Sequence, residues 1–121
     1  MAHARIDKLD TSRAASAPGV VAVLTAEDFK EVGGVPCGWQ VTGKDGPMKE
    51  PKHPILAEGK VRHVGDPIAA VIAESLREAK DAAELIDLEL TELPAVVDMR
   101  KALEGGGEPV HTEAEDNLCF D

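Results

Sequence analysis

Short runs of hydrophobic residues separated by turns recur along the chain, and five of them predict β-strands. Residues 4–9 alternate between hydrophobic and charged side chains, with Leu9 one step out of phase, which predicts a short edge strand. Residues 20–24 are uniformly hydrophobic and predict a buried strand, and residues 60–64 predict another short strand. Residues 68–73 form a continuous apolar run, which predicts a central strand buried on both faces.

The clearest helix signal begins at Ser75. Its hydroxyl can accept the amide of Glu78, and the Glu78 carboxylate can accept the amide of Ser75, as in a capping box. Apolar residues then recur at helical spacing and predict one packing face: Leu76, Ala79, Ala83 and Ile86. The period next changes to two, so residues 86–90 predict a half-exposed strand with Asp87 and Glu89 pointing outward.

Three shorter helical turns are predicted by their capping residues. They are residues 11–17 after a cap at Asp10 or Thr11, residues 25–28 as a second capping box, and residues 98–103 before the glycines 105–107. Residues 118–120, near the end of an acidic tail, resemble the first residues of a further strand.

The order of these elements predicts the fold class. A buried strand, a capped helix and a second strand follow one another and resemble a βαβ-type unit whose two strands could be parallel. We therefore expect residues 1–121 to be a single α+β domain, with a small mixed sheet, one main helix and one or two short helices. The elements are too few for a doubly wound sheet.

A long loop, residues 33–54, interrupts this order. Its five glycines and four prolines prevent a helix or strand of normal length. Loops of this length in compact domains are often functional or covered by a partner. A lone tryptophan in such a loop is either a core plug or an interface anchor, and both interpretations stay open. The candidate interface residues are Cys37, Gly38, Trp39 and Gln40.

Composition narrows the range of partners. A net charge of −10 repels phosphate backbones and anionic membranes, and an aromatic content of 2% leaves few platforms for stacking bases. No apolar stretch is long enough to span a bilayer. The only two cysteines, Cys37 and Cys119, lie far apart and suit reduced thiols. We expect a cytoplasmic protein that binds no nucleic acid and no membrane.

No constellation of residues predicts an active site. The four histidines, His3, His53, His63 and His111, have no ligand spacing and no Cys-x-x-Cys pair exists, so we interpret them as exposed or loop histidines. The two glycine clusters are residues 33–34 and 105–107, and neither matches a phosphate-binding loop. The acidic residues of the main helix and the following strand are typical of a solvated face. The sequence therefore predicts no catalytic, cofactor-binding or metal-binding residue.

Several stretches resemble the xanthine dehydrogenase and aldehyde oxidase family. Residues 63–74 are similar to its segment V-G-x-P-[IV]-A-x-V-[VI]-A, and residues 18–25 to its strand P-G-V-x-x-V-[LF]-[TD]. Residues 79–86 and 92–98 resemble its A-x-x-A-A-x-x-[IV] helix and Y-E-x-L-P strand end. In this order, with these gaps, they are typical of the family's α/β hammerhead domain and cover nearly the whole chain. Leu90 departs from the Tyr or Phe that is frequent there.

The resemblance implies a parent enzyme of the molybdenum hydroxylase type, most similar to the carbon monoxide dehydrogenase-like members. Such an oxidoreductase hydroxylates an aldehyde or N-heterocycle with oxygen from water, or oxidises carbon monoxide. Its large subunit binds the molybdopterin cofactor, while iron–sulfur clusters and FAD are on partner subunits. The family's cofactor and catalytic residues lie C-terminal to the hammerhead domain, so none is carried over. We expect a domain that is inactive alone, scaffolds the remainder of the large subunit and contacts the iron–sulfur and FAD subunits.

Two alternatives from other classes stay open. A free-standing carrier-like or protein-binding module would need an exposed lysine at a hairpin tip, and Lys49 between Met48 and Glu50 is a faint match. A small enzyme with Cys37 as its nucleophile would need a base beside the thiol, for which His53 or His63 is a candidate.

Overall fold

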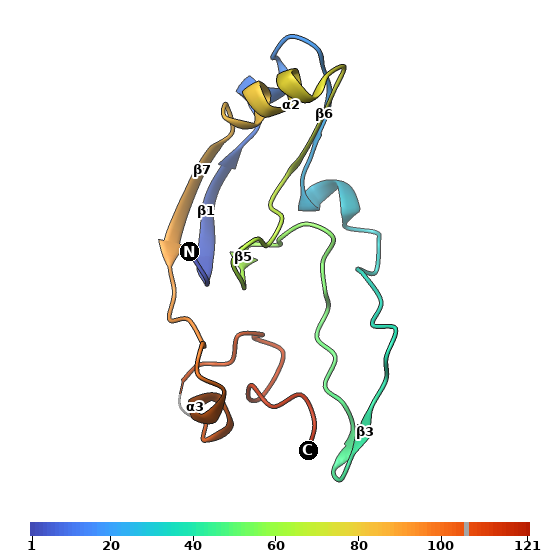
Figure 1. Ribbon diagram of the computed structural model, residues 1–121, viewed down its shortest axis with the longest axis vertical. Coiled ribbons are helices and arrows are strands. Elements are labelled where there is room, and N and C mark those ends of the chain that lie inside the picture. Colours follow the sequence, from blue (N-terminus) through green and yellow to red (C-terminus); the bar gives the residue numbers. More distant parts are fainter. Residues whose placement is uncertain (106) are drawn as a thin grey trace.

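The computed structural model describes residues 1–105 and 107–121, and the molecule is elongated (Figure 1). The elements in chain order are β1 (Ala4–Asp10), α1 (Ser12–Ala15), β2 (Val20–Leu24), the 3-10 turn η1 (Ala26–Phe29), β3 (Thr42–Gly43), β4 (Gly46–Pro47), β5 (Lys60–Val61), β6 (Ala70–Ala73), α2 (Leu76–Ala83), β7 (Asp87–Glu92) and α3 (Met99–Leu103). The predicted mixed α and β class is confirmed. Its strands form three short sheets instead of one.

The largest sheet has three antiparallel strands in the order β5–β1–β7. The edge-strand prediction for residues 4–9 was wrong, because β7 pairs with β1 along one side and β5 pairs with its first residues on the other. A small aliphatic core lies against this sheet. It consists of Ala4, Ala57 and Val61, with Ile6, Ile68 and Leu90 packed against them.

The phase slip within residues 4–9 has a structural cause. The register of β1 against β7 shifts around Asp7, which is the extra residue of a β-bulge. Its carboxylate accepts the hydroxyl of Thr91 at 2.5 Å and the Nε of Arg5 at 2.6 Å. The bulge turns the following residues by one position, so the hydrophobic side chains stay on the core side of the sheet.

The second sheet is a ribbon of only two antiparallel strands, β2 and β6. Residues 68–73 were predicted to be buried on both faces, and that prediction was wrong: Ile72 is 47% exposed. The prediction of a buried strand at residues 20–24 was also wrong at Val21, which is 70% exposed beside a register shift. Both strands are wholly apolar, but among the described residues no third strand joins them.

The connection between β6 and β7 is not a parallel βαβ unit. β6 pairs with β2 and β7 pairs with β1, both antiparallel, so the two strands that flank α2 lie in different sheets. Figure 1 shows α2 at one end of the molecule, where it bridges the ends of these two sheets. The hydrophobic pattern alone could not distinguish this crossover from a parallel one, because both place an apolar helix face on strands.

The N-terminus of α2 is capped as predicted by Ser75, whose hydroxyl accepts the amide of Glu78 at 3.2 Å. The reciprocal half of the box was predicted incorrectly. The Glu78 carboxylate accepts the hydroxyl of Ser75 at 2.7 Å instead of its amide. Asp98 likewise caps α3 by accepting the amides of residues 100 and 101. Gly105 follows α3 with a positive φ, whereas Gly106 of the predicted glycine stop lies outside the described residues.

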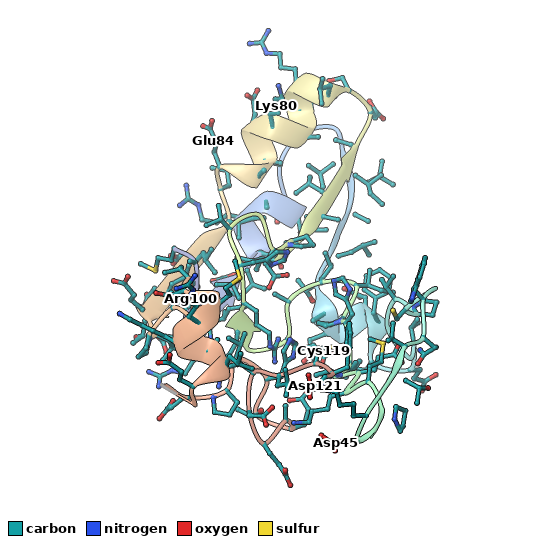
Figure 2. All side chains as sticks on the ribbon, turned by 60° about the horizontal axis from the view of Figure 1, so that its bottom comes forward. Asp45, Lys80, Glu84, Arg100, Cys119 and Asp121 are labelled. Atoms are coloured by element: carbon teal, nitrogen blue, oxygen red, sulfur yellow. The ribbon has the colours of Figure 1, made fainter. Side chains whose placement is uncertain are left out.

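The packing face of α2 differs from the predicted one. Ala82 is fully buried, whereas Leu76 is 72% exposed and Ala83 is exposed. α2 packs against α1, whose Ala14 is also fully buried, and small side chains at both positions permit this close approach. The opposite side carries charged residues, with Lys80 and Glu84 pointing away from the body of the molecule (Figure 2).

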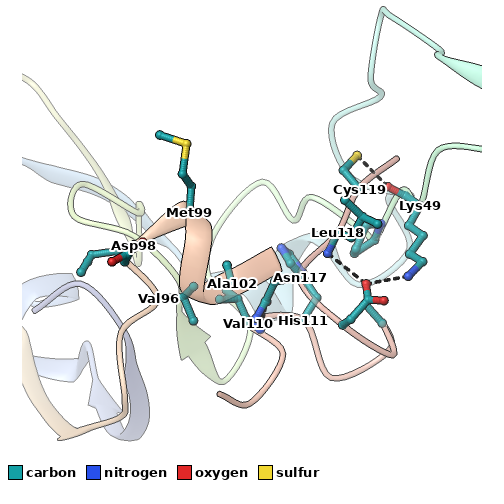
Figure 3. Close-up of a pocket in the computed structure, with 14 residues that line it drawn as sticks. Lys49, Val96, Asp98, Met99, Ala102, Val110, His111, Asn117, Leu118 and Cys119 are labelled. Carbon is teal, nitrogen blue, oxygen red and sulfur yellow. Dashed lines mark hydrogen bonds and ion pairs between the residues drawn. The ribbon is translucent and has the colours of Figure 1, made fainter. Parts of the chain in front are cut away.

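The long loop and the C-terminal tail lie side by side at the other end (Figure 1). The loop contains only the two-residue strands of the β3–β4 hairpin. The predicted strand at residues 118–120 was wrong, because no ladder forms. Instead the Lys49 amide donates to the Cys119 carbonyl at 2.8 Å, and the Lys49 ammonium pairs with Asp116 at 2.6 Å (Figure 3). Prolines in the loop remove the further amides that a ladder would need.

Candidate interface loop and adjacent cavity

The four predicted interface residues lie together on one exposed loop that a single carboxylate braces. Glu50 accepts the amide of Cys37 at 3.2 Å with one oxygen and the side-chain amide of Gln40 at 2.5 Å with the other. The Cys37 thiol donates to the carbonyl of Trp39 at 3.1 Å. Sequence reasoning missed Glu50, because its role depends on the return path of an irregular loop and not on any periodic pattern.

Trp39 projects from this braced loop and is 76% exposed. The interpretation of Trp39 as a core plug was therefore wrong. A large side chain held in place by its loop loses little further conformational freedom when it is covered, which favours binding. Gly38 beside it is exposed, and nothing lies within 4 Å of the place a Cβ would occupy, so this glycine leaves the surface open.

A cavity of about 520 Å³ lies beside the same loop. Residues distant in sequence line it, from the loop, from the turn after β5 and from the C-terminal tail. Its polar lining includes Cys37, His53, Arg62, His63, Asp66 and His111. Sequence reasoning did not select Arg62 or Asp66, because their approach to the tail depends on the tertiary fold.

The histidines do not form a metal site. His53, His63 and His111 line the cavity, but within residues 1–105 and 107–121 no group of three His, Cys, Asp or Glu side chains could hold a metal ion. Of the four histidines, His3 is buried, in the bend directly before β1. Its Nδ1 lies 2.8 Å from the carbonyl of Pro94.

The turn after β5 is fixed by Asp66, whose carboxylate accepts the amide of Arg62 at 2.8 Å. The same carboxylate lies 3.6 Å from Nδ1 of His63. On the opposite wall, burial lowers the pKa of His111, and the positive charge of Arg62 lowers it further. The imidazole of His111 is therefore neutral at pH 7.

The geometry does not favour the two alternative functions. Among the described residues, the Cys37 thiol makes no hydrogen bond to a histidine, so no base activates it. Lys49 is ion-paired with Asp116 and follows β4, so it is not the free lysine at a hairpin tip that a carrier needs. In the part of the chain that the structure describes, every helix is too short or too polar to cross a bilayer.

Comparison with known proteins identifies related sequences. Residues 1–94 match the profile of a family described as "Aldehyde oxidase and xanthine dehydrogenase, a/b hammerhead domain". Over 119 residues the chain is 40% identical to the nicotine 6-hydroxylase large subunit of Paenarthrobacter nicotinovorans. That alignment covers 97% of this chain and 14% of the relative, so the chain spans a small part of its length.

Solved structures agree with this match. The aldehyde oxidoreductase of Desulfovibrio desulfuricans superposes with a TM-score of 0.79 at 30% identity, over 99% of this chain and 13% of that one. A Cu,Mo-containing carbon monoxide dehydrogenase superposes with a TM-score of 0.74 at 32% identity, over 98% of this chain and 14% of that one. At these identities the likeness extends beyond the fold to the sequence.

Proposed function

The chain belongs to the aldehyde oxidase and xanthine dehydrogenase family, as an a/b hammerhead domain, and we propose that it is a non-catalytic domain of a molybdenum-dependent oxidoreductase large subunit. The match over residues 1–94 is the observation that carries this proposal. We take residues 1–121 as one domain, because Lys49 and Asp116 tie the tail beyond residue 94 to the long loop. The domain scaffolds the catalytic region of the subunit.

The proposed substrates are aldehydes, N-heterocycles or carbon monoxide. The names of the similar proteins support this range, since they are a nicotine hydroxylase, an aldehyde oxidoreductase and a carbon monoxide dehydrogenase. The proposed setting is the cytoplasm, where a reducing environment suits the free thiols of Cys37 and Cys119.

The residues of this chain do not fit a molybdenum centre. The described residues offer no group of three potential metal ligands, and the Cys37 thiol donates to the carbonyl of Trp39. We therefore assign the cofactor to another part of the large subunit, and the iron–sulfur clusters and FAD to partner subunits. The contribution of this chain is the contact that it makes with those parts.

Residues 37–40 are the proposed contact. Trp39 provides a large exposed side chain, and Glu50 fixes the loop that presents it. Tryptophan is enriched among the residues that dominate binding energy at protein interfaces. The braced loop thus combines an aromatic anchor with polar groups at its rim.

The test uses the full-length large subunit co-expressed with its partner subunits. Trp39→Ala is expected to weaken assembly by about thirtyfold, which corresponds to about 2 kcal/mol for a binding hot spot. Leu76→Ala is the matched control, because Leu76 is about equally exposed but lies on α2 at the far end of the molecule. Size-exclusion chromatography at graded concentrations measures the assembled fraction.

Molybdenum content per large subunit is measured on the same samples and should be equal in the wild type and both variants. Equal assembly of Trp39→Ala and the wild type would remove residues 37–40 from the interface. A loss of molybdenum in Trp39→Ala without a loss of assembly would contradict the non-catalytic role.

A further inference from the structure

A second cavity, of about 450 Å³, adjoins the one beside the interface loop. The two cavities share five lining residues, which are Lys49, Pro51, Val110, His111 and Cys119. Together they form one groove between α3, the long loop and the C-terminal tail. Apolar side chains dominate the second cavity, and Val96, Ala102 and Val110 gather beside α3 (Figure 3). The groove is continuous with the proposed contact at residues 37–40, because Cys37 lines its other half.

Exposed apolar side chains form the rim of this groove at α3. Met99 lines the second cavity and is 86% exposed, and Leu103, one helical turn further along the same side of α3, is 67% exposed. Val97, just before the helix, also lines the cavity and is 86% exposed. A cluster of large exposed apolar side chains beside a cavity is typical of a binding face.

The charged side chains that line the second cavity already have partners within the chain. Lys49 and Asp116 pair with each other at 2.6 Å, and Asp98 caps α3 by accepting two amides of that helix. The side chain of Asn117 accepts the amide of Val110 at 2.9 Å. Among the described residues, a charged ligand therefore has no free ion-pair partner in this cavity, and the surface left to cover is apolar.

The distribution of charge separates this groove from the opposite end of the molecule, where α2 lies (Figure 1). Residues 74–92, which include α2 and β7, carry seven acidic and two basic side chains and so account for half of the net charge of −10. Interface cores are depleted in charged residues, and permanent interfaces are more apolar than transient ones. The groove has the composition of a permanent interface, whereas the α2 end has that of a solvated surface.

We propose that the groove binds an apolar segment of the same large subunit, from the catalytic region that this domain scaffolds. The inference rests on the proposed function and names the surface on which that scaffolding contact is made. The alignment with the nicotine 6-hydroxylase large subunit covers 14% of that relative, so most of such a subunit lies outside these 121 residues. A permanent contact within one subunit accounts for the apolar character of the groove better than a contact between separate subunits.

The path of the tail supports this choice of occupant. Leu118 and Cys119 line the second cavity, and the Lys44 amide donates to the Asp121 carbonyl at 2.6 Å, which holds the tail beside the β3–β4 hairpin. In a large subunit, the polypeptide that follows this tail starts two residues beyond Cys119. Its covalent link gives that polypeptide a high effective concentration at the groove, which a separate chain lacks.

Amide hydrogen exchange, followed by mass spectrometry, compares the full-length large subunit, purified without its partner subunits, with the 121-residue chain. Amides of residues 96–103 are expected to exchange about tenfold more slowly in the large subunit, because the docked segment covers α3. Residues 35–41 contain the proposed subunit contact and are the internal reference. Their exchange should slow only when the partner subunits are added.

Met99→Glu places a charge on the rim of the groove, and Leu76→Glu is the matched control, because Leu76 is 72% exposed on α2. Both side chains are exposed in the 121-residue chain, so neither variant should shift its urea midpoint appreciably. In the large subunit, Met99→Glu is expected to return the exchange of residues 96–103 to within about twofold of the 121-residue chain. Leu76→Glu should keep the slow exchange. Slow exchange that survives Met99→Glu would overturn the proposal.

The wild-type samples identify any other occupant. Slow exchange of residues 96–103 that appears only after the partner subunits are added would assign the groove to those subunits. Slow exchange that depends on the concentration of the 121-residue chain would assign it to a second copy, and equal exchange in every sample would leave the groove without an occupant. Each of these results contradicts the proposal. Molybdenum content and assembly, measured on the same large subunit, test the proposed function separately, so that either can fail while the other stands.

Discussion

The two ends of the molecule are held together in different ways. At one end, residues 4–30 and 60–92 form main-chain ladders, and α2 packs on α1 through fully buried alanines. At the other end, residues 33–54 and 95–121 are joined mainly by single hydrogen bonds and exposed ion pairs, such as Lys49 with Asp116. The first end is cooperative, because each strand supports its neighbour. The second depends on separate contacts.

This difference indicates where each kind of function is expected. The ladder region, residues 4–30 and 60–92, provides a stable frame. Apolar residues such as Val21 and Ile72 remain exposed on it, so another part of the protein could cover them. The loop region, residues 33–54 and 95–121, contains the exposed Trp39 and the cavity beside it. Binding residues concentrate on loops that a rigid scaffold positions, and the chain follows that division.

Amide hydrogen exchange should separate the two regions most strongly. The amides at the start of β1, where β5 and β7 pair on both sides, are expected to exchange about a thousandfold more slowly than those of residues 35–41, a difference of about 4 kcal/mol in local opening free energy. β6, in a two-stranded ribbon, should be intermediate. Exchange measured by mass spectrometry tests this order, and equal protection of the loop and β1 would break the comparison.

Overpacking the ladder region should cost more than breaking a contact in the loop region. Ala82→Leu inserts a larger side chain between α2 and α1 and is expected to lower the free energy of unfolding by about 2 kcal/mol. Ala83→Leu, one residue along on the exposed side, is the matched control and should change it little. Urea unfolding measures both. A similar cost at both positions would contradict the packing face of α2.

Asp116→Asn tests the other region with the same measurement. The Lys49–Asp116 pair is exposed, so its loss should leave the urea midpoint of the ladder region nearly unchanged. The expected effect is local. Amides near Lys49 and Cys119 should exchange faster, because the neutral asparagine no longer forms an ion pair with Lys49. A large fall in global stability would show that the tail is part of the cooperative core.

The sequence predicted the ladder region well at the level of single elements. β1, β2, α2 and β7 lie where the hydrophobic periods placed them, and Ser75 and Asp98 cap helices as their spacing indicated. Periodicity reports which residues prefer the interior, not which strand pairs with which. Periodicity therefore missed the central position of β1 and the placement of β6 and β7 in different sheets. It also missed that α2 buries Ala82 instead of its predicted apolar face.

The candidate sites were harder to predict, for a physical reason. Trp39 stood out as a rare residue in a polar loop, but Glu50 gains its role only from contacts that the folded loop creates. No local pattern marks a carboxylate that will bond an amide thirteen residues away. That role depends on the path of the folded loop.

The smallest expected effect concerns the bulge of β1 and its dependence on pH. The hydrogen bond from Thr91 is the largest cause that lowers the pKa of Asp7 below its ordinary value of 3.8, and Arg5 lowers it further. Because the pKa is lower in the folded state, the ionised carboxylate stabilises the fold above pH 3.8. This contribution is lost as the pH falls through the folded-state pKa, which lies below 3.8.

Thr91→Val removes that hydrogen bond, so the variant should be less stable than the wild type at about pH 6, and the difference should shrink as the pH falls below 3.8 through the lowered pKa of Asp7. Thr42→Val, in the β3–β4 hairpin and away from any carboxylate bond in the described structure, is the control for the change of side chain. Urea midpoints measured across this pH range provide the test. A Thr91→Val difference that is constant with pH would mean that Asp7 gains nothing from Thr91, and that the bulge is held by its backbone pairing alone.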